Sequence, residues 1–330
     1  MYELLRKTLI ILICLMLSKT LHMTVGVYLL LFAILLSTTT VSKHIHQLLG
    51  KLLPAVICAL GATLVNQAFS EHPFIIWTCC LVFFDHVRRQ ANTNLKIGQA
   101  VLPLFMIIFV TTYHNSGTYT DALIFYMHDV VLSAGVVAFV TSFMNHIMPP
   151  KSAPSAPQVI HQPVTGSDRL KILVLVGGGL AFIMINQVTS AVFCLVPLVT
   201  SAMQPTHQHM KQHSKEKLLS QIGGCCLAII MSMVYSGTEV NLFSYALISF
   251  LLIYLILYWI QHSEPVDKAI HGDALMGFLI PYQLYIAQYG NNFGLNSITL
   301  RATELMIALV IIYIVAHWLD SLARHRPPAQ

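Results

Sequence analysis

Charged residues are scarce in this sequence. They make up 9% of its 330 residues, against roughly a quarter in an ordinary soluble domain, while 56% of the positions are hydrophobic. This shortage of charge excludes a soluble globular protein. The formal net charge of +5 comes from basic residues scattered singly between apolar runs, without aromatic interleaving. The composition therefore gives no indication of nucleic-acid binding.

Motifs for nucleotide or metal chemistry are also missing. No Walker motif is present, and the glycine clusters lie inside apolar runs rather than in a strand-turn-helix, so the chain is not expected to hydrolyse ATP. The seven cysteines lack the spacing of a zinc site or a disulfide framework and are expected to act as small core hydrophobes. The sequence predicts no cofactor and no enzyme.

Long apolar runs are what the sequence does contain. About 20 apolar residues cross ~30 Å of hydrocarbon at 1.5 Å per residue, and such runs are predicted to be helices because open sheets cannot satisfy their backbone in lipid. Twelve runs predict an all-α, polytopic integral membrane protein. They span residues 6–22, 24–41, 51–69, 72–87, 97–114, 122–147, 169–187, 189–204, 217–235, 241–261, 273–290 and 301–320.

A stretch rich in Pro, Ser and Ala separates the sixth predicted span from the seventh. Residues 149–168 cannot continue a helix and are predicted to form a linker. Residues 1–148 and 169–330 are then two six-helix halves. Sixteen of the 18 Lys and Arg residues fall on the side that carries the linker and both termini, and only Lys19 and Arg301 fall on the other. The positive side is predicted to be cytoplasmic.

The two halves carry similar residues in the same order, which predicts an internal repeat. Because six is an even number, both halves enter the membrane from the cytoplasm, and the repeat is parallel about an axis along the membrane normal. The matched pairs are Lys7 with Lys171, Lys51 with Lys217, Pro103 with Pro281, and Asp129 with Glu304.

These features resemble those of a known family. A basic residue precedes each half (Arg6-Lys7, Arg169/Lys171), a short second span follows, and a third span rich in small residues comes after a basic loop. In them the sequence is similar to the fusaric acid resistance and aromatic acid exporter type of bacterial inner-membrane protein, in its compact two-repeat form. The usual Gly-Thr pair of the third helix is absent. The resemblance implies efflux of small organic acids, often alongside a periplasmic adaptor protein.

Ionisable side chains inside the spans are candidates for function, because each costs roughly 2.5 to 3.5 kcal/mol on insertion scales. Asp129 has no basic residue nearby in sequence and is the predicted proton-coupling carboxylate. Glu304 follows Arg301 by three residues, a helical spacing that permits an ion pair. Arg301 is a candidate exit site for an anionic substrate. The alternatives are a solvated helix start for Asp129 and a structural pair for the other two.

The fourth span ends in charges of both signs, at Asp85, Arg88 and Arg89. One interpretation is a snorkelling anchor at the interface. The other is a cytoplasmic gate that attracts organic anions.

Polar and proline residues inside the spans are candidates for lining a substrate path. Kinks at the two prolines would free backbone carbonyls, whereas interhelical hydrogen bonds of about 0.6 kcal/mol are the alternative explanation for the amides. The candidates are Asn66, Gln67, Pro103, Asn186, Gln187, Pro281, Gln283 and Gln288.

A histidine-rich loop invites a metal interpretation. His209 and His213 are four residues apart, as zinc ligands on a helix can be, and His207 is close by. No carboxylate or cysteine lies beside them, so an interfacial cluster that titrates near neutrality is predicted instead of a metal site.

The sequence therefore predicts a secondary transporter of the bacterial inner membrane that exports small organic, anionic or aromatic compounds by proton antiport. Its expected partners are the organic acid substrate, the lipid bilayer and a periplasmic adaptor, and a homo-oligomer is compatible with the pattern. The alternative is a non-transporting scaffold subunit of an envelope complex. A membrane enzyme that uses the histidine loop comes third.

Overall fold

The structure is a computed structural model. It describes residues 2–21, 23, 26–39, 42–115, 123–149, 159–187, 192, 195–204, 207–236, 241–263 and 265–283, together with scattered helical positions between 300 and 318. The described residues confirm the all-α prediction, since their only extended pairing is a single bridge between Thr93 and His161.

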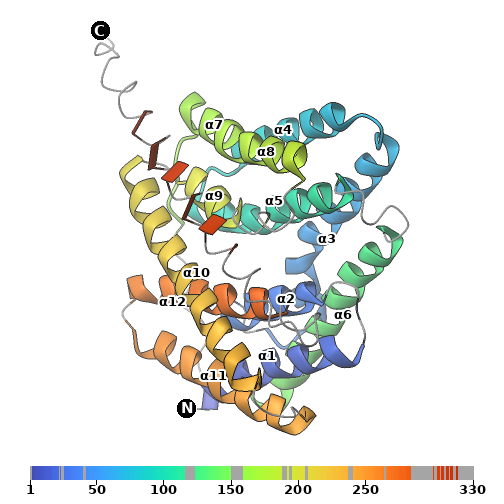
Figure 1. The fold of residues 1–330 in the computed structure, drawn as a ribbon, viewed down its shortest axis with the longest axis vertical. Helices are drawn as coiled ribbons and strands as arrows, with labels where there is room; N and C mark the ends of the chain where they lie inside the picture. Colours follow the sequence, from blue (N-terminus) through green and yellow to red (C-terminus); the bar gives the residue numbers. More distant parts are fainter. Residues whose placement is uncertain are drawn as a thin grey trace. The chain divides into compact units, whose positions relative to one another are not determined.

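The described helices follow one another in chain order. They are α1 (Tyr2–Thr20), α2 (Val27–Thr39), α3 (Ile45–Ala68), α4 (Pro73–Gln90), α5 (Asn94–Asn115), α6 (Leu123–Ile147), α7 (Gly166–Ile172), the π-helical segment η1 (Leu173–Gly177), α8 (Gly178–Asn186), α9 (Leu195–Ala202), α10 (His207–Ser236), α11 (Leu242–His262) and α12 (Pro265–Pro281) (Figure 1).

Five of these helices contain a segment long and apolar enough to cross a membrane. The segments are Ile45–Ala68, Asn94–Thr112, Phe125–Ile147, Ser214–Val234 and Leu242–His262. Many large apolar side chains on these helices are exposed, among them Phe139, Phe243 and Leu251, as expected for surfaces that face lipid. The chain is therefore a multi-pass membrane protein.

Local sequence sets several helix ends. Thr165 accepts a hydrogen bond from the amide of Asp168, and the Asp168 carboxylate accepts one from the Thr165 amide, which is a complete capping box at the start of α7. Pro73 stands in the first turn of α4, where its missing N–H costs nothing. Asn241 caps α11 by accepting from the Ser244 amide.

The chain divides into two compact units, each built from separate stretches of sequence. Unit 1 comprises residues 1–56, 124–156 and 219–299, and unit 2 comprises residues 57–123, 157–218 and 300–330. Neither unit coincides with one of the predicted halves, 1–148 and 169–330. Compactness is not a test of internal repetition, so the division at 149–168 stays a prediction.

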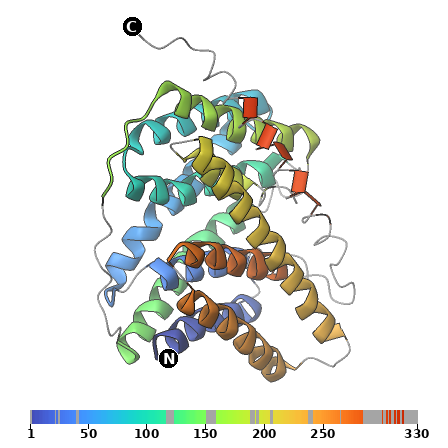
Figure 2. The same ribbon diagram turned by 90° about the vertical axis from the view of Figure 1, so that its left-hand side faces the viewer.

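In unit 1, two helices from each half pack together. Helix α1 packs against α2 and against α11, α11 packs against α12, and α12 returns to α2. Figure 2 shows α1, at the N-terminus, alongside α11.

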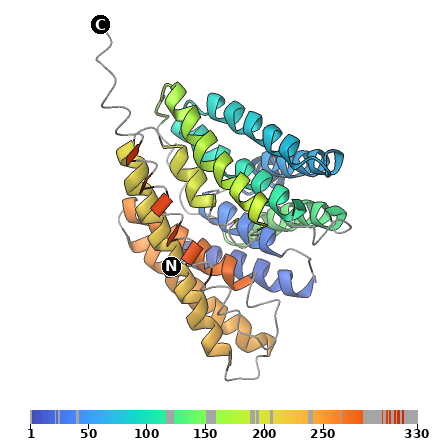
Figure 3. The same cartoon turned by 45° about the horizontal axis from the view of Figure 1, so that its top comes forward.

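In unit 2, α4 packs against α5, α7 and η1, while α9 packs against η1 and α5. Figure 3 shows the green α7 and α8 alongside the blue-green α4. Each unit thus joins helices from before the linker to helices from after it.

Glycines permit close helix packing, as their clustering in apolar runs predicts. A Cβ at Gly224 of α10 would lie 2.5 Å from backbone atoms of Ala274 and Gly277, and a Cβ at Gly277 would lie 2.7 Å from the Cα of Gln221. Gly223, by contrast, has open space on its side. The backbones of α10 and α12 therefore touch at Gly224.

Candidate functional site

Asp168 is the centre of a buried ion network in unit 2. Lys171 Nζ donates to its Oδ1 at 3.0 Å, and Arg88 Nη2 lies 3.7 Å from its Oδ2. The side chains of Arg88 and Lys171 are each 2% exposed and that of Asp168 is 5% exposed. The Thr165 hydroxyl and amide also donate to Oδ2, at 2.7 and 3.0 Å. One carboxylate is thus surrounded by two buried cations and a helix cap.

Asp85 forms the outer part of the network. The guanidinium of Arg169 donates to both of its oxygens, with Nη2 to Oδ2 at 2.9 Å, and Arg89 Nε lies 2.9 Å from Oδ2. These side chains are more exposed than the inner group, at 18% for Asp85, 36% for Arg169 and 58% for Arg89. The double hydrogen bond from Arg169 joins α4 to α7 with fixed geometry.

The fold brings these charges together by placing the end of α4 against the start of α7. The buried face of α4 repeats every fourth residue, at Ile76, Cys80, Phe84 and Arg88. The α4–α5 loop also pairs with the chain that precedes α7: the amide of Gln162 donates to the carbonyl of Asn92, and the amide of Asn94 to that of Ile160. Both segments are therefore held at the network.

The network carries more positive than negative charge. Among the residues that the structure describes, Arg88, Arg89, Arg169 and Lys171 pair with two carboxylates, Asp85 and Asp168, which leaves a formal surplus of two positive charges. Arg88 Nη1 donates to the carbonyl of Ala91 at 3.0 Å, but its Nε is buried without a hydrogen-bond partner in the described part of the chain. Buried charges of this kind are costly unless a partner balances them.

Burial and hydrogen bonding set the titration of the inner group. Burial alone raises the pKa of the Asp168 carboxyl, but hydrogen bonds from Thr165 and Lys171 and the charge of Lys171 outweigh it, and the pKa lies below its ordinary value. Burial lowers the pKa of Arg88, and the Asp168 carboxylate opposes that shift. The Asp168 side chain is therefore deprotonated throughout the neutral pH range.

The three residues predicted to form a cytoplasmic gate all belong to this network. Arg89 extends into solvent as a snorkelling anchor would, but Arg88 is buried, which an interfacial anchor does not explain. In the sequence, Arg169 and Lys171 were noted as topogenic charges, as part of the family resemblance and, for Lys171, as the match to Lys7, but they were not predicted to belong to a site, and Asp168 was not singled out. The Thr165-x-x-Asp168 capping pattern was the available signal for this helix start.

A smaller pair occupies the start of α1 in unit 1. Arg6 Nη2 lies 3.4 Å from Glu3 Oε1, three residues before it, and Arg6 Nη1 donates to the carbonyl of Met148 at 3.4 Å. Arg6 is buried, as Lys171 is. A buried base therefore follows an acid by three residues near the start of both α1 and α7.

The predicted coupling carboxylate Asp129 lies in α6 and is 5% exposed. The Nδ1 atom of His128, whose side chain is 67% exposed, lies 3.6 Å from its Oδ1. Glu304 is half-buried. Arg301 lies outside the described residues, so the predicted pair of Arg301 and Glu304 stays a prediction.

Of the predicted path residues in unit 2, only Asn66 is buried. Its Nδ2 donates to the carbonyl of Ala62 and to Thr111 Oγ1, which also contacts Cys80 Sγ at 3.7 Å. Gln67, Asn186 and Gln187 are exposed, and Pro103 lies inside α5, half-buried. Asn186 donates to the carbonyl of Phe182, and Gln187 ends α8 with a φ of 55°.

The remaining path residues belong to unit 1. Pro281 is the last residue of α12, and Gln283 lies two residues later and is 5% exposed. Gln283 Oε1 is buried and has no hydrogen-bond partner among the residues described. Gln288 lies outside the described residues. The role of these residues in a substrate path therefore stays a prediction.

The histidine-rich segment forms the first turns of α10, which begins at His207. The side chains of His207, His209 and His213 lie outside what is described. Within the described residues, no group of three or more His, Cys, Asp and Glu side chains has the arrangement of a metal site. Of the cysteines described, all are free, and Cys14, Cys80 and Cys225 are buried.

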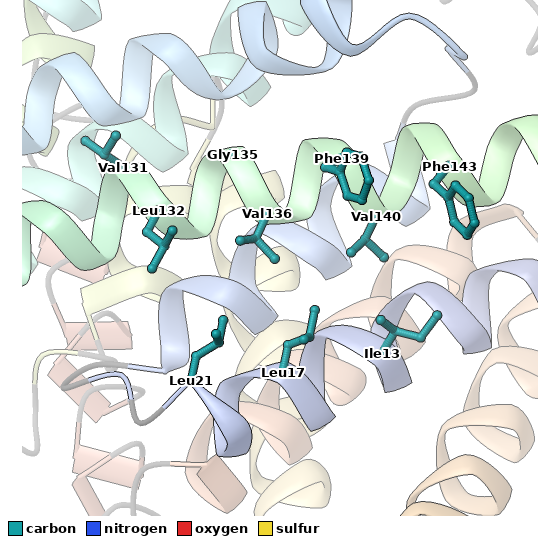
Figure 4. Close-up of a pocket in the computed structure, with 10 residues that line it drawn as sticks. All are labelled: Ile13, Leu17, Leu21, Val131, Leu132, Gly135, Val136, Phe139, Val140 and Phe143. Atoms are coloured by element: carbon teal, nitrogen blue, oxygen red, sulfur yellow. The ribbon is translucent and has the colours of Figure 1, made fainter.

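A cavity in unit 1 is lined by apolar residues. It has a volume of about 750 Å³ and lies between α1 and α6. Figure 4 shows Ile13 and Leu17 of α1, with Leu21 just after its end, pointing toward Leu132, Val136 and Val140 of α6. A groove with this lining suits hydrocarbon and offers no group that would recognise a charged solute.

Helix α7 continues into the π-helical segment η1, which sequence reasoning missed. Trp77 Nε1 of α4 donates to the carbonyl of Gly177, the last residue of η1, at 2.8 Å. π-helical turns are rare and frequent at functional sites. The run Gly177-Gly178-Gly179 was the local signal, but glycine alone does not distinguish a wide turn from close packing.

One family model matches the chain. It is that of DUF2955, described as a protein of unknown function, and it covers residues 3–145. The match therefore takes in α1 to α6 and ends near the boundary of the first predicted half. No curated protein and no solved structure matches the sequence.

Proposed function

We propose that this chain is a secondary transporter of the bacterial inner membrane that exports small organic anions, aromatic ones among them, in exchange for protons. The observation that carries the proposal is the ion network of unit 2. It holds two nearly inaccessible cations, Arg88 and Lys171, against one inner carboxylate, and its total charge is positive. Ionisable groups in membrane proteins are expensive to bury and mark solute pathways, and a positive surplus favours anions.

The proposed architecture is two six-helix repeats within a twelve-span chain, and recurring helix pairings are the argument for the repeat. Helix α1 packs on α2 and α11, while its counterpart, the run from α7 to α8, packs on α9 and α4. Helices α11 and α4 occupy the fourth place in their halves, and α12 and α5 the fifth. The same set of pairings thus occurs twice. In each set, the first two helices of one half pack with the fourth and fifth helices of the other half. Short second helices, α2 and α9, and long third helices, α3 and α10, recur in the same order.

Contacts between helix ends support the proposed topology. The end of α4 meets the start of α7 at the ion network. In unit 1, the end of α6 meets the loop before α3, where Ser142 donates to the carbonyl of Lys43 and Asn145 to that of Ser42. The charge asymmetry assigns every one of these ends to the cytoplasm, together with both termini.

In this proposal the ion network is a cytoplasmic gate. The anion is attracted by the basic residues Arg88, Arg89, Arg169 and Lys171. Asp85 and Asp168 hold these residues in ion pairs between α4 and α7, and the pairs rearrange as the anion passes. Asp129 takes up the coupling proton, Arg301 and Glu304 form the outer exit, and a periplasmic adaptor receives the product. The resemblance to the fusaric acid resistance and aromatic acid exporter type supplies the adaptor and the aromatic substrates.

Transport by purified protein in proteoliposomes with an imposed pH gradient tests the proposal, with benzoate as the solute. Arg88→Gln should reduce the rate at least tenfold. Lys96→Gln is the matched control, because it removes one positive charge from the same loop region, where Lys96 is exposed and its side chain donates to Asn92 alone among the described residues. Asp129→Asn should abolish the dependence on the pH gradient and leave the amount of folded protein unchanged. An equal loss in the Lys96 and Arg88 variants, or no benzoate flux in wild type, would favour the scaffold alternative.

A further inference from the structure

A cavity of about 380 Å³ adjoins Asp168 and Lys171 in unit 2. It lies between the last residues of the linker and the first turn of α7, and we name it the linker cavity. Its lining residues are His161, Gln162, Pro163, Thr165, Ser167, Asp168 and Lys171. Within the proposed topology it opens on the cytoplasmic side of the gate.

The carboxylate in its wall does not make the linker cavity negative. Asp168 already accepts hydrogen bonds from Lys171 and from the amide and hydroxyl of Thr165, and Arg88 lies 3.7 Å away. Asp168, Arg88 and Lys171 together therefore carry one net positive charge. The Lys171 ammonium carries three N–H donors, and Asp168 takes one of them.

Other side chains in the wall supply donors beside Lys171. The Ser167 hydroxyl, the Gln162 amide and the His161 ring can each donate a hydrogen bond. The Gln162 Oε1 atom is buried and accepts no hydrogen bond from any residue that the structure describes. This oxygen is an acceptor and cannot bind an oxyanion itself, so the part of Gln162 that can bind one is the Nε2 amino group, which carries two N–H donors.

We infer that the linker cavity binds one oxyanion, the carboxylate or phosphate of a small organic anion, through Lys171, Ser167 and Gln162. This inference rests on the proposed function and names the place where the transported anion is first held on the cytoplasmic side. The phosphate of a lipid headgroup shares the same chemistry, so the experiment separates a soluble anion from a lipid.

The test measures binding without transport. Full-length protein in nanodiscs of neutral lipid is titrated with benzoate, with inorganic phosphate and with uncharged benzamide. We expect the two anions to bind and benzamide not to bind. Repeating the titration with anionic phosphatidylglycerol in the disc identifies the source: competition by this lipid assigns the site to a headgroup phosphate, and undiminished binding assigns it to a soluble anion.

Two variants locate the binding in the linker cavity. Ser167→Asp places a negative charge in its wall, in the first turn of α7, where an acidic residue does not disturb a helix. It should weaken benzoate binding at least tenfold. Gln162→Leu removes the free amide without changing the charge and should weaken binding several-fold. Gln47→Glu is the control, since it adds the same charge to the first turn of α3 and keeps the oxygen that accepts from Ser42.

The outcomes distinguish this inference from the proposed function. Equal affinity in wild type, Ser167→Asp and Gln162→Leu would overturn the cavity assignment, as would equal binding of benzamide and benzoate. If binding shows the expected dependence on Ser167 but proteoliposomes move no benzoate, the transport proposal fails and the site remains. If Arg88→Gln reduces transport but Ser167→Asp leaves benzoate binding unchanged, only the cavity inference fails.

Discussion

Replacing Asp168 by Asn should destabilise unit 2 strongly. The substitution keeps the size of the side chain and an oxygen that can accept from the Thr165 amide, so the helix cap is largely preserved. It removes the only carboxylate within 4 Å of Lys171 and Arg88 in the described structure, and both of these side chains are 2% exposed. Leaving buried charges without their partner costs about 3 to 5 kcal/mol, more than a hundredfold in the folding equilibrium.

A double-mutant cycle with Lys171→Met isolates the ion pair. Lys171→Met alone should cost less than Asp168→Asn, because the carboxylate keeps Arg88 and Thr165 as partners. The double variant should recover about 1 to 3 kcal/mol relative to the sum of the single variants, since it leaves no unpaired lysine. Denaturant unfolding in detergent, followed by the fluorescence of Trp77 in the same unit, measures the cycle. A loss below about 1 kcal/mol in Asp168→Asn, or no coupling, would refute the reasoning.

Three further outcomes follow from the same geometry. Gly224→Ala should destabilise the protein by about 1 to 3 kcal/mol in thermal unfolding, because the added methyl overlaps the backbone of α12, whereas Gly223→Ala should be neutral. The pKa of Asp168 is depressed below its ordinary 3.8, so its stabilising contribution should be present above about pH 4 and be lost as the pH falls through the folded-state pKa. The free energy of unfolding, measured against pH, should therefore fall less steeply at acid pH in Asp168→Asn than in wild type. An alkaline phosphatase fused after Pro157 should be inactive, and an active fusion would contradict the cytoplasmic linker.

The sequence was most informative about local structure. Apolar runs of membrane length predicted the helices, and the mixed charges at the end of the fourth span marked one side of the ion network. Proline and serine predicted a break after residue 148, and α7 begins at Gly166, near the predicted end of the linker. These features depend on residues close together in the chain, where composition and spacing suffice.

The partners of those residues could not be predicted in the same way. Asp85 bonds to Arg169 and Arg88 to Asp168, across more than 70 residues of sequence, and no spacing rule selects such pairs. The burial of Arg88 is likewise a property of the packed α4 and α7. The π-helical turn at η1 arises where Trp77 supplies a donor to Gly177, which again is a tertiary contact.

The packing of helices across the linker leads to a last prediction. Helix α1 finds its packing partner α11, and α4 finds α7 and η1, only across the linker, so neither half contains a complete unit. Residues 1–156 expressed alone should be degraded or fail to fold, because α1 and α4 would expose the side chains that now pack on the other half. Co-expression with residues 157–330 should restore a stable complex in which the two pieces co-purify. The complex should also retain the contact between positions 85 and 169. Cysteines placed at these two positions, in a variant otherwise free of cysteine, should therefore form a disulfide. A first half that is stable by itself, with α1 and α4 protected from thiol reagents, would show that the two halves fold independently and would remove the basis for an exchanged repeat.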